Sequence, residues 1–217
     1  MIRHALTLFR FQLVEERRSG EVAMVLTPFG AVALLVVPMA VGIDTPLLDR
    51  IGPGLFWAVV LLFGTLVTQR QSAFPDRARR DALTLLGVDP AARFAASAAA
   101  AAILLLAFEV AMGVVTVFLY DPKVTGWWWM VLLLPLVAGG LGLLGTLAGS
   151  VATGFRGGTL APLLVVPLAV PMLLGAARAT EGLQSGDGIL RWILLLALMD
   201  LILALAGVLT ARPLEES

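Results

Sequence analysis

Six long apolar segments constrain the fold of this chain more than any other feature of its sequence. They occupy about residues 22–43, 52–69, 91–119, 126–152, 159–177 and 189–211. At a rise of about 1.5 Å per residue, each can cross a hydrocarbon core of roughly 30 Å, the shortest only barely. Backbone groups in lipid must form hydrogen bonds within their own segment, so helices are expected. The sequence therefore predicts an all-α membrane protein with six transmembrane helices in one domain, residues 1–217, whose bundle covers 22–211.

The composition supports this fold class and gives no sign of a nucleic-acid partner. Hydrophobic residues make up 59% of the 217 residues and charged residues only 14%, whereas soluble domains have roughly 25% charged residues. The formal net charge is zero, so no overall charge attracts a polyanion.

The rarity of three residue types excludes several kinds of site. There is no cysteine, and His4 is the single histidine, which rules out thiolate metal sites, disulfides and a paired-histidine haem site. Lys123 is the single lysine and follows Asp121-Pro122, so no Gly-rich phosphate-binding loop is present. We therefore expect a non-catalytic chain that binds no cofactor or metal itself. If ATP drives it, a separate subunit must supply the ATP site.

The distribution of basic residues predicts the orientation in the membrane. Four fall on one side of the predicted spans, namely Arg50, Lys123, Arg178 and Arg191. Eleven fall on the other side, namely Arg3, Arg10, Arg17, Arg18, Arg70, Arg77, Arg79, Arg80, Arg93, Arg156 and Arg212. The positive-inside rule then places both termini and the loop 69–93 in the cytoplasm.

The N-terminal residues 1–20 are predicted to form an amphipathic helix on the membrane surface. One face carries Ile2, Ala5, Leu6, Phe9 and Leu13, and the opposite face carries Arg3, Thr7, Arg10, Arg17 and Arg18. An apolar face opposite a basic one suits the interface with anionic lipid. The alternative is a plain N-terminal cytoplasmic extension.

Prolines and an N-cap signal bear on the shapes of the predicted helices. Pro53 is expected at the first position of the second helix, and Asp89 is expected to cap a third helix that begins at Pro90 and protrudes into the cytoplasm. The fifth segment contains Pro162, Pro167 and Pro171, which together predict a broken or re-entrant helix.

The fourth segment combines aromatic and small residues. It begins with Trp127-Trp128-Trp129, which indicates an aromatic belt at the membrane–water interface. The alternative, a haem-binding tryptophan motif, lacks the flanking histidines. Gly145 and Gly149 form a small-xxx-small pair that permits close helix packing, within the chain or between copies.

Two acidic residues, Glu109 and Asp200, lie near the middle of the third and sixth segments. A charged side chain at that depth costs about 2.5–3.5 kcal/mol on insertion scales. Each is therefore expected to face the interior, to be paired or to be protonated. They are interpreted either as a substrate or proton site or, with more weight, as buried hydrogen bonds between helices.

The longest polar interruption, residues 69–93, contains a short amphipathic segment, Pro75–Leu86. Pro75 can open a helix with Asp76 in its first turn, and Gly87 can end it. Its apolar face is formed by Ala78, Ala82, Leu85 and Leu86. Such a helix fits a groove in a partner protein, and a position against lipid headgroups is the nearly equal alternative.

Five stretches, in this order and spacing, resemble the CcmB (haem exporter protein B) family over essentially the whole length. They are Ile51–Trp57, Gln69-Arg70, Asp81–Leu86, Gly154–Gly158 and Val166–Pro171. Members of this family are permease subunits of the cytochrome c maturation ABC transporter. The resemblance implies a multi-pass protein of the bacterial inner membrane that works with a CcmA-like ATPase, CcmC-like and CcmD-like membrane proteins and a CcmE-like haem chaperone. A second copy of the chain is also expected.

The resemblance further implies that Pro75–Leu86 is a coupling helix that sits on the ATPase. The expected contact residues are Pro75, Asp76, Arg77, Arg80, Asp81, Leu83 and Leu86. ATP would then be bound by the partner, and haem would be handled by the complex. The alternatives are an ABC exporter permease for another hydrophobic substrate, or an ion-coupled membrane protein or membrane enzyme that uses Glu109 and Asp200.

Overall fold

A computed structural model describes residues 2–20, 22–42, 44–73, 87–122, 126–154, 160–186 and 188–211. Their regular structure is helical. The long helices are α1 (Ile2–Ser19), α2 (Thr27–Val41), α3 (Thr45–Ala73), α5 (Pro90–Tyr120), α6 (Met130–Gly154), α7 (Leu160–Ser185) and α8 (Leu190–Ala211). A short π-helical turn, η1 (Val22–Leu26), leads into α2, and a 3-10 turn, η2 (Trp127–Trp129), leads into α6. The predicted all-α class is confirmed.

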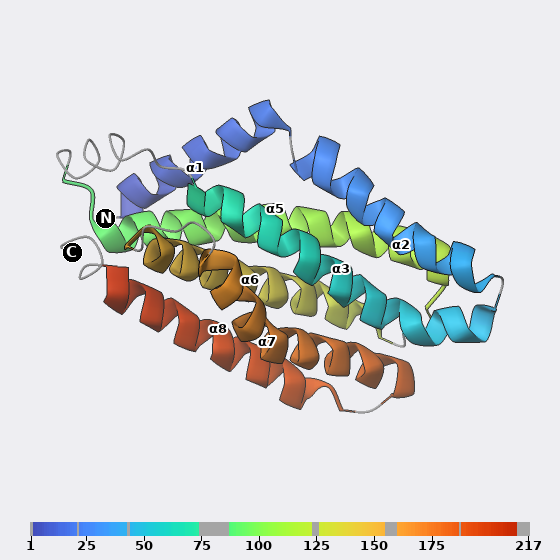
Figure 1. Cartoon of the computed structure of the whole chain (residues 1–217). Helices are drawn as coiled ribbons and strands as arrows, with labels where there is room; N and C mark the ends of the chain where they lie inside the picture. Colours follow the sequence, from blue (N-terminus) through green and yellow to red (C-terminus); the bar gives the residue numbers. More distant parts are fainter. Residues whose placement is uncertain are drawn as a thin grey trace.

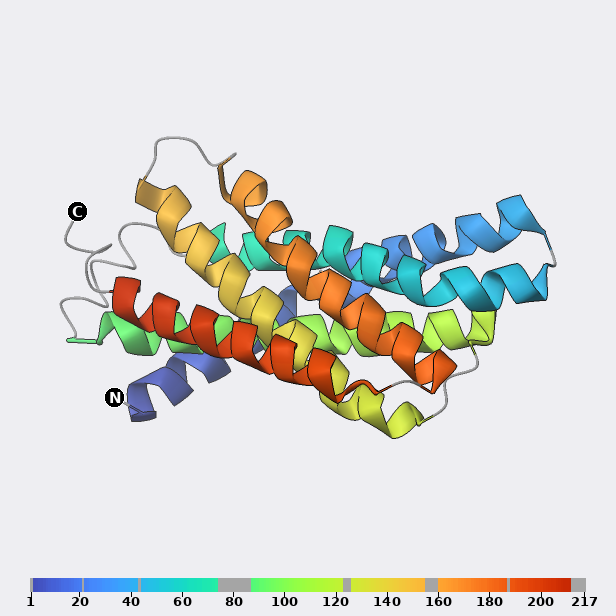
Figure 2. The ribbon, with the colours of Figure 1, turned by 90° about the horizontal axis from the view of Figure 1, so that it is seen from below.

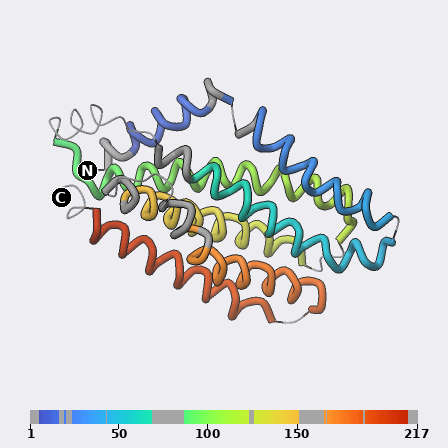
Figure 3. The backbone as a smooth tube through the Cα atoms, viewed as in Figure 1, coloured from blue at the N-terminus to red at the C-terminus, as the bar shows by residue number. Residues whose placement is uncertain are grey.

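The helices from α2 to α8 lie side by side in one elongated bundle (Figures 1 and 2). From α2 onward, successive helices reverse direction, as the backbone tube shows (Figure 3), so that α3 and α8 end, and α1 and α5 begin, at the same end of the bundle. Helices α5 and α6 are central, because α6 packs against α3, α5, α7 and α8, and α5 also packs against α1 and α2. Helix α1 lies outside this set of side-by-side helices and runs obliquely beside the first part of α5.

Among the described residues, five segments are long and apolar enough to cross a membrane. They are Met24–Val41, Thr45–Thr68, Pro90–Tyr120, Trp127–Ser150 and Leu190–Ala211. These match five of the six predicted spans. The remaining predicted span falls in α7, which does not meet the same criterion within the described residues, so the count of six spans stays a prediction.

Helix α5 confirms the predicted N-cap. The Asp89 carboxylate accepts a hydrogen bond from the Ala91 backbone N–H at 3.0 Å, and Pro90 follows directly. The helix has 31 residues, which corresponds to about 46 Å at the usual helical rise. It is therefore longer than the hydrocarbon core is thick, and its first turns can extend beyond that core.

Two predictions about prolines are wrong. Helix α3 begins at Thr45, so Pro53 lies inside the helix and not at its start. The true start is capped by Asp44, whose carboxylate accepts from the Leu47 N–H at 3.3 Å. Helix α7 continues unbroken through Pro167 and Pro171. A helix next to neighbouring helices tolerates proline because only one backbone bond is lost at each position.

Side chains from other helices satisfy two of the carbonyls that proline leaves without an N–H donor. The Leu34 carbonyl would ordinarily accept from residue 38, which is Pro38, and instead accepts from the Tyr120 hydroxyl at 2.6 Å. The Asp49 carbonyl likewise lacks its usual N–H donor, because residue 53 is a proline, and it accepts from Gln184 Nε2 at 3.1 Å. Proline in these helices therefore creates inter-helix hydrogen bonds, α5 to α2 and α7 to α3.

Glycines set the distance between α6 and its neighbours. A Cβ atom on Gly142 would lie 2.9 Å from both Ala98 O and Ala102 N, so the α6 backbone touches the α5 backbone. Gly145 likewise leaves no room for a Cβ, because Thr68 of α3 occupies that space. The prediction of close packing at Gly145 is thus supported, within the chain itself.

Candidate functional site

The predicted ATPase-docking segment, Pro75–Leu86, lies outside the described residues, so its seven expected contact residues stay a prediction. The structure describes what flanks the segment. Helix α3 ends before it at Ala73, and α5 begins after it at Pro90. Gly87 has a φ of +69°, a conformation that glycine adopts readily and that suits the predicted helix terminator.

Helix α1 lies at the same end of the bundle and packs against α5. Gln12 Nε2 donates to Ser97 Oγ at 3.0 Å across this contact. Phe9 and Leu13, two members of the predicted apolar face, are half-buried, whereas Leu6 is 50% exposed. Part of the amphipathic face is therefore used against α5. The position of α1 relative to a membrane surface stays a prediction.

Glu109 lies in the interior of the bundle, as predicted for an acid at this depth. Its side chain on α5 is 0% exposed. Neither carboxyl oxygen has a hydrogen-bond partner among the described residues. The described residues therefore give no support to the more heavily weighted interpretation, a buried hydrogen bond that locks helices together, and that interpretation stays untested.

The other buried polar side chains do not supply the missing donor. In the described part of the chain, four threonines are buried besides Glu109, and each donates its single O–H to a carbonyl of its own helix. The bonds are Thr65 to Leu62, Thr68 to Thr65, Thr116 to Met112 and Thr180 to Ala176, at 2.8, 3.0, 2.8 and 2.8 Å. Since a hydroxyl has one hydrogen to donate, these groups leave Glu109 without a partner.

Asp200 faces α6, at a place where α6 and α7 both come close to α8. Its carboxylate, together with Met172 of α7, fills the space that a side chain on Gly140 would need. The neighbouring Gly139 lies near the second oxygen, 3.6 Å from Oδ2 to an ideal Cβ position. One oxygen, Oδ1, is buried without a hydrogen-bond partner among the described residues. Asp200 therefore lies against Gly139 and Gly140 of α6, and these two residues offer its carboxylate no polar side chain.

The structure does not join the two acids into one site. No hydrogen bond connects Glu109 to Asp200 in the described part of the chain, and no group of three His, Cys, Asp or Glu there could hold a metal ion. Among the described residues, Glu109 and Asp200 therefore do not form a hydrogen-bonded carboxylate pair.

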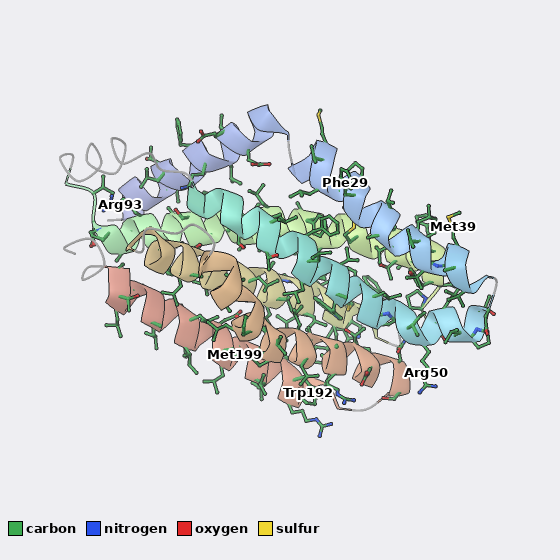
Figure 4. The ribbon with its side chains drawn as sticks, in the orientation of Figure 1. Phe29, Met39, Arg50, Arg93, Trp192 and Met199 are labelled. Carbon is green, nitrogen blue, oxygen red and sulfur yellow. The ribbon has the colours of Figure 1, made fainter. Side chains whose placement is uncertain are left out.

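At the opposite end from α1, α3 and α7 are joined by a buried hydrogen bond that the sequence did not predict. Trp57 Nε1 donates to Thr180 Oγ1 at 2.9 Å. An indole N–H within an apolar segment was the available signal, since buried tryptophans generally find a partner. Arg50 of α3 lies at this end and Arg93 of α5 at the other (Figure 4). Their separation agrees with the predicted grouping of basic residues on opposite sides.

The tryptophan cluster also lies at this end, at the start of α6. Trp127 is 71% exposed, and the Trp128 and Trp129 rings stack with centroids 4.1 Å apart. Exposed aromatic rings at the end of an apolar helix agree with the predicted interfacial belt.

Comparison with known proteins gives one consistent result. A protein-family model described as "CcmB protein" matches residues 3–217. The chain is 33% identical over 216 residues to "Heme exporter protein B" of Paracoccus denitrificans, covering 96% of each chain. The proteins of that name from Pseudomonas aeruginosa and Haemophilus influenzae are 32% identical over 203 residues and 31% identical over 176 residues. These matches cover 86% of this chain and 86% of the first relative, and 76% and 79% for the second.

Proposed function

The chain belongs to the CcmB protein family, and from this premise we propose that it is the membrane-spanning permease subunit of an ABC transporter complex for cytochrome c biogenesis. The observation that carries the proposal is the family match over residues 3–217, together with relatives named as haem exporters. A bundle whose described residues include five helices apolar enough to cross a membrane suits such a subunit.

ATP hydrolysis takes place on a separate, CcmA-like subunit in this proposal. The support is in the sequence, because the single lysine, Lys123, follows Asp121-Pro122 and no Gly-rich phosphate loop contains it. The energy drives haem delivery or the release of a haem-loaded, CcmE-like chaperone. The chain binds neither ATP nor haem as a cofactor of its own. CcmC-like and CcmD-like membrane proteins and a second copy of this chain complete the complex.

The coupling element is Pro75–Leu86. Two observations support this choice. The segment joins the end of α3 to the start of α5 at the end of the bundle where α1 also begins and α8 ends. It also carries three of the chain's arginines, Arg77, Arg79 and Arg80. A short basic, amphipathic helix is well suited to a groove on a partner.

The protein is a membrane protein with several apolar helices. We place it in the bacterial inner membrane, with six spans and both termini in the cytoplasm. The support is the excess of arginines on one side of the spans. Cysteine substitutions at Ser72 and Ser185 test the orientation, since a membrane-impermeant thiol reagent on intact cells should label only the latter. Labelling of residue 72 alone would show that the orientation is the reverse of the one proposed.

Co-purification with the ATPase tests the coupling role. The tagged wild-type chain should retain the ATPase, and Arg77→Glu/Arg80→Glu should retain at least tenfold less. Arg178→Glu is the matched control, because it reverses an arginine at the other end of the bundle, where Arg178 forms an exposed ion pair with Glu181. Equal retention by all three proteins would exclude Pro75–Leu86 as the docking element.

An ATPase assay separates this function from the nearest rival, an ABC exporter for another hydrophobic substrate. Haem-loaded chaperone should stimulate ATP hydrolysis by the reconstituted complex, and haem-free chaperone should not. Stimulation by unrelated hydrophobic compounds alone would favour the rival function.

A further inference from the structure

We propose that Glu109 is a proton-binding site inside the helix bundle, and that occupancy of this site is linked to the packing of α5 against α6. The proposal goes beyond the function proposed above and does not depend on an ATPase or on haem. It rests on the full burial of Glu109, on the absence of a hydrogen-bond partner among the described residues, and on the charges of the surrounding helices.

Glu109 belongs to a face of α5 that is packed against α6 and α3. The residues that share this face, at helical spacing, are Ala98, Ala102 and Leu105. Ala98 and Ala102 touch the α6 backbone at Gly142, and Leu105 lies against Gly64 of α3. Because Glu109 is 0% exposed, water can reach it only if the packing around α5 opens, and we place that opening at the α5–α6 contact.

Within the described residues, the helices packed against α5 place their basic residues away from the level of Glu109. Helix α5 contacts α1, η1, α2, α3, α6 and α8, and of these η1, α2 and α6 contain no titratable residue. Helix α3 carries Asp49 and Arg50 in its first two turns and Arg70 in its last. Helix α8 carries Arg191 in its first turn and Asp200, which faces α6. Helix α1 carries Arg3, His4, Arg10, Glu15, Glu16, Arg17 and Arg18, and its hydrogen bond from Gln12 reaches Ser97, in the first turns of α5. The remaining titratable groups of α5 are Arg93 and Tyr120, at its two ends.

A buried carboxyl with no counter-ion and no donor is stable only in its neutral form, because an ionised carboxylate cannot be left without solvation in an apolar interior. The packed bundle therefore holds a proton on Glu109. A conformation in which water enters between α5 and α6 releases that proton. The equilibrium between the two conformations then shifts by up to tenfold per pH unit, as linkage requires for one proton.

Infrared difference spectroscopy of the full chain in lipid nanodiscs tests the protonation state directly. The wild-type minus Glu109→Gln spectrum at neutral pH should contain the C=O stretching band of a protonated acid without a hydrogen bond. Glu181→Gln is the matched control, because Glu181 is exposed and paired with Arg178, and its difference spectrum should contain carboxylate bands. Carboxylate bands in both spectra would overturn the proposal.

If Glu109→Gln does not fold, the wild-type protein still decides the question. Labelling the glutamate side-chain carboxyls with carbon-13 should shift the acid band, whereas labelling the aspartate carboxyls should leave it in place. Absence of any glutamate acid band at neutral pH again overturns the proposal.

Hydrogen–deuterium exchange tests the linkage to packing. The wild-type to Glu109→Gln ratio of exchange rates, at amides of the α5–α6 contact, should rise by up to tenfold per pH unit. The ratio cancels the intrinsic pH dependence of exchange. An acid band combined with a flat ratio supports the proton site and overturns the linkage.

Discussion

Replacing Tyr120 by phenylalanine removes the hydroxyl that donates to the Leu34 carbonyl of α2 at 2.6 Å. The ring is 3% exposed, so its apolar contacts should be retained. The Leu34 carbonyl then loses its donor in a buried contact, because Pro38 has no N–H to offer. Leaving a buried acceptor unsatisfied costs about 1–3 kcal/mol, more than the net value of an ordinary hydrogen bond. Tyr120→Phe should therefore destabilise the protein by about 1–3 kcal/mol.

A double-mutant cycle with Pro38→Ala makes this prediction specific. Alanine at position 38 restores an N–H that can bond to the Leu34 carbonyl within α2. In that background the Tyr120 hydroxyl is dispensable, and its removal should cost about 1 kcal/mol less than in the wild-type background. Pro38→Ala alone should be neutral or stabilising, because alanine is the better helix former.

The assay is reversible unfolding of the four proteins in mixed detergent micelles, followed by circular dichroism. Gln184→Met, alone and with Pro53→Ala, provides a parallel cycle at the other proline-freed carbonyl, Asp49 O. Its coupling should be smaller, because Gln184 and Asp49 are only half-buried and water can replace the amide. If Tyr120→Phe costs the same in the wild-type and the Pro38→Ala backgrounds, the carbonyl freed by proline is not the reason for the bond.

Three further predictions concern helix packing, a buried hydrogen bond and a surface ion pair, and all use the same unfolding assay. Gly142→Ala should destabilise the protein by about 1–3 kcal/mol, because its Cβ would meet α5 backbone atoms at 2.9 Å. The control Gly54→Ala, whose Cβ meets nothing within 4 Å, should be neutral or stabilise by up to about 1 kcal/mol. Equal effects of the two substitutions would refute the argument that α5 and α6 approach closely at Gly142. Trp57→Phe should cost about 1–3 kcal/mol by removing the indole that donates to Thr180, and less in a Thr180→Val background, so additive effects would count against the bond. Glu181→Gln should change stability by less than about 0.5 kcal/mol and lose any effect at high salt, since its ion pair with Arg178 is more than half exposed.

Predictions from the sequence were correct where the structure depends on residues of the same segment. The Asp89 cap and the start of α5 at Pro90 depend on residues next to each other. The interior position of Glu109 follows from its place in an apolar helix. The predictions failed at Pro53 and in α7, where neighbouring helices outweigh the tendency of proline to end or break a helix.

The sequence by itself therefore determined that this chain is built of apolar helices and contains neither a Gly-rich phosphate-binding loop nor a histidine pair for haem. It could not assign partners across the bundle. The bonds Tyr120 to Leu34, Trp57 to Thr180 and Gln184 to Asp49 join residues 86, 123 and 135 positions apart. Helix formation in lipid is enforced locally by backbone hydrogen bonding, whereas these contacts depend on how helices align. The tertiary structure alone decided that two proline-freed carbonyls would receive donors and that Glu109 would receive none among the described residues.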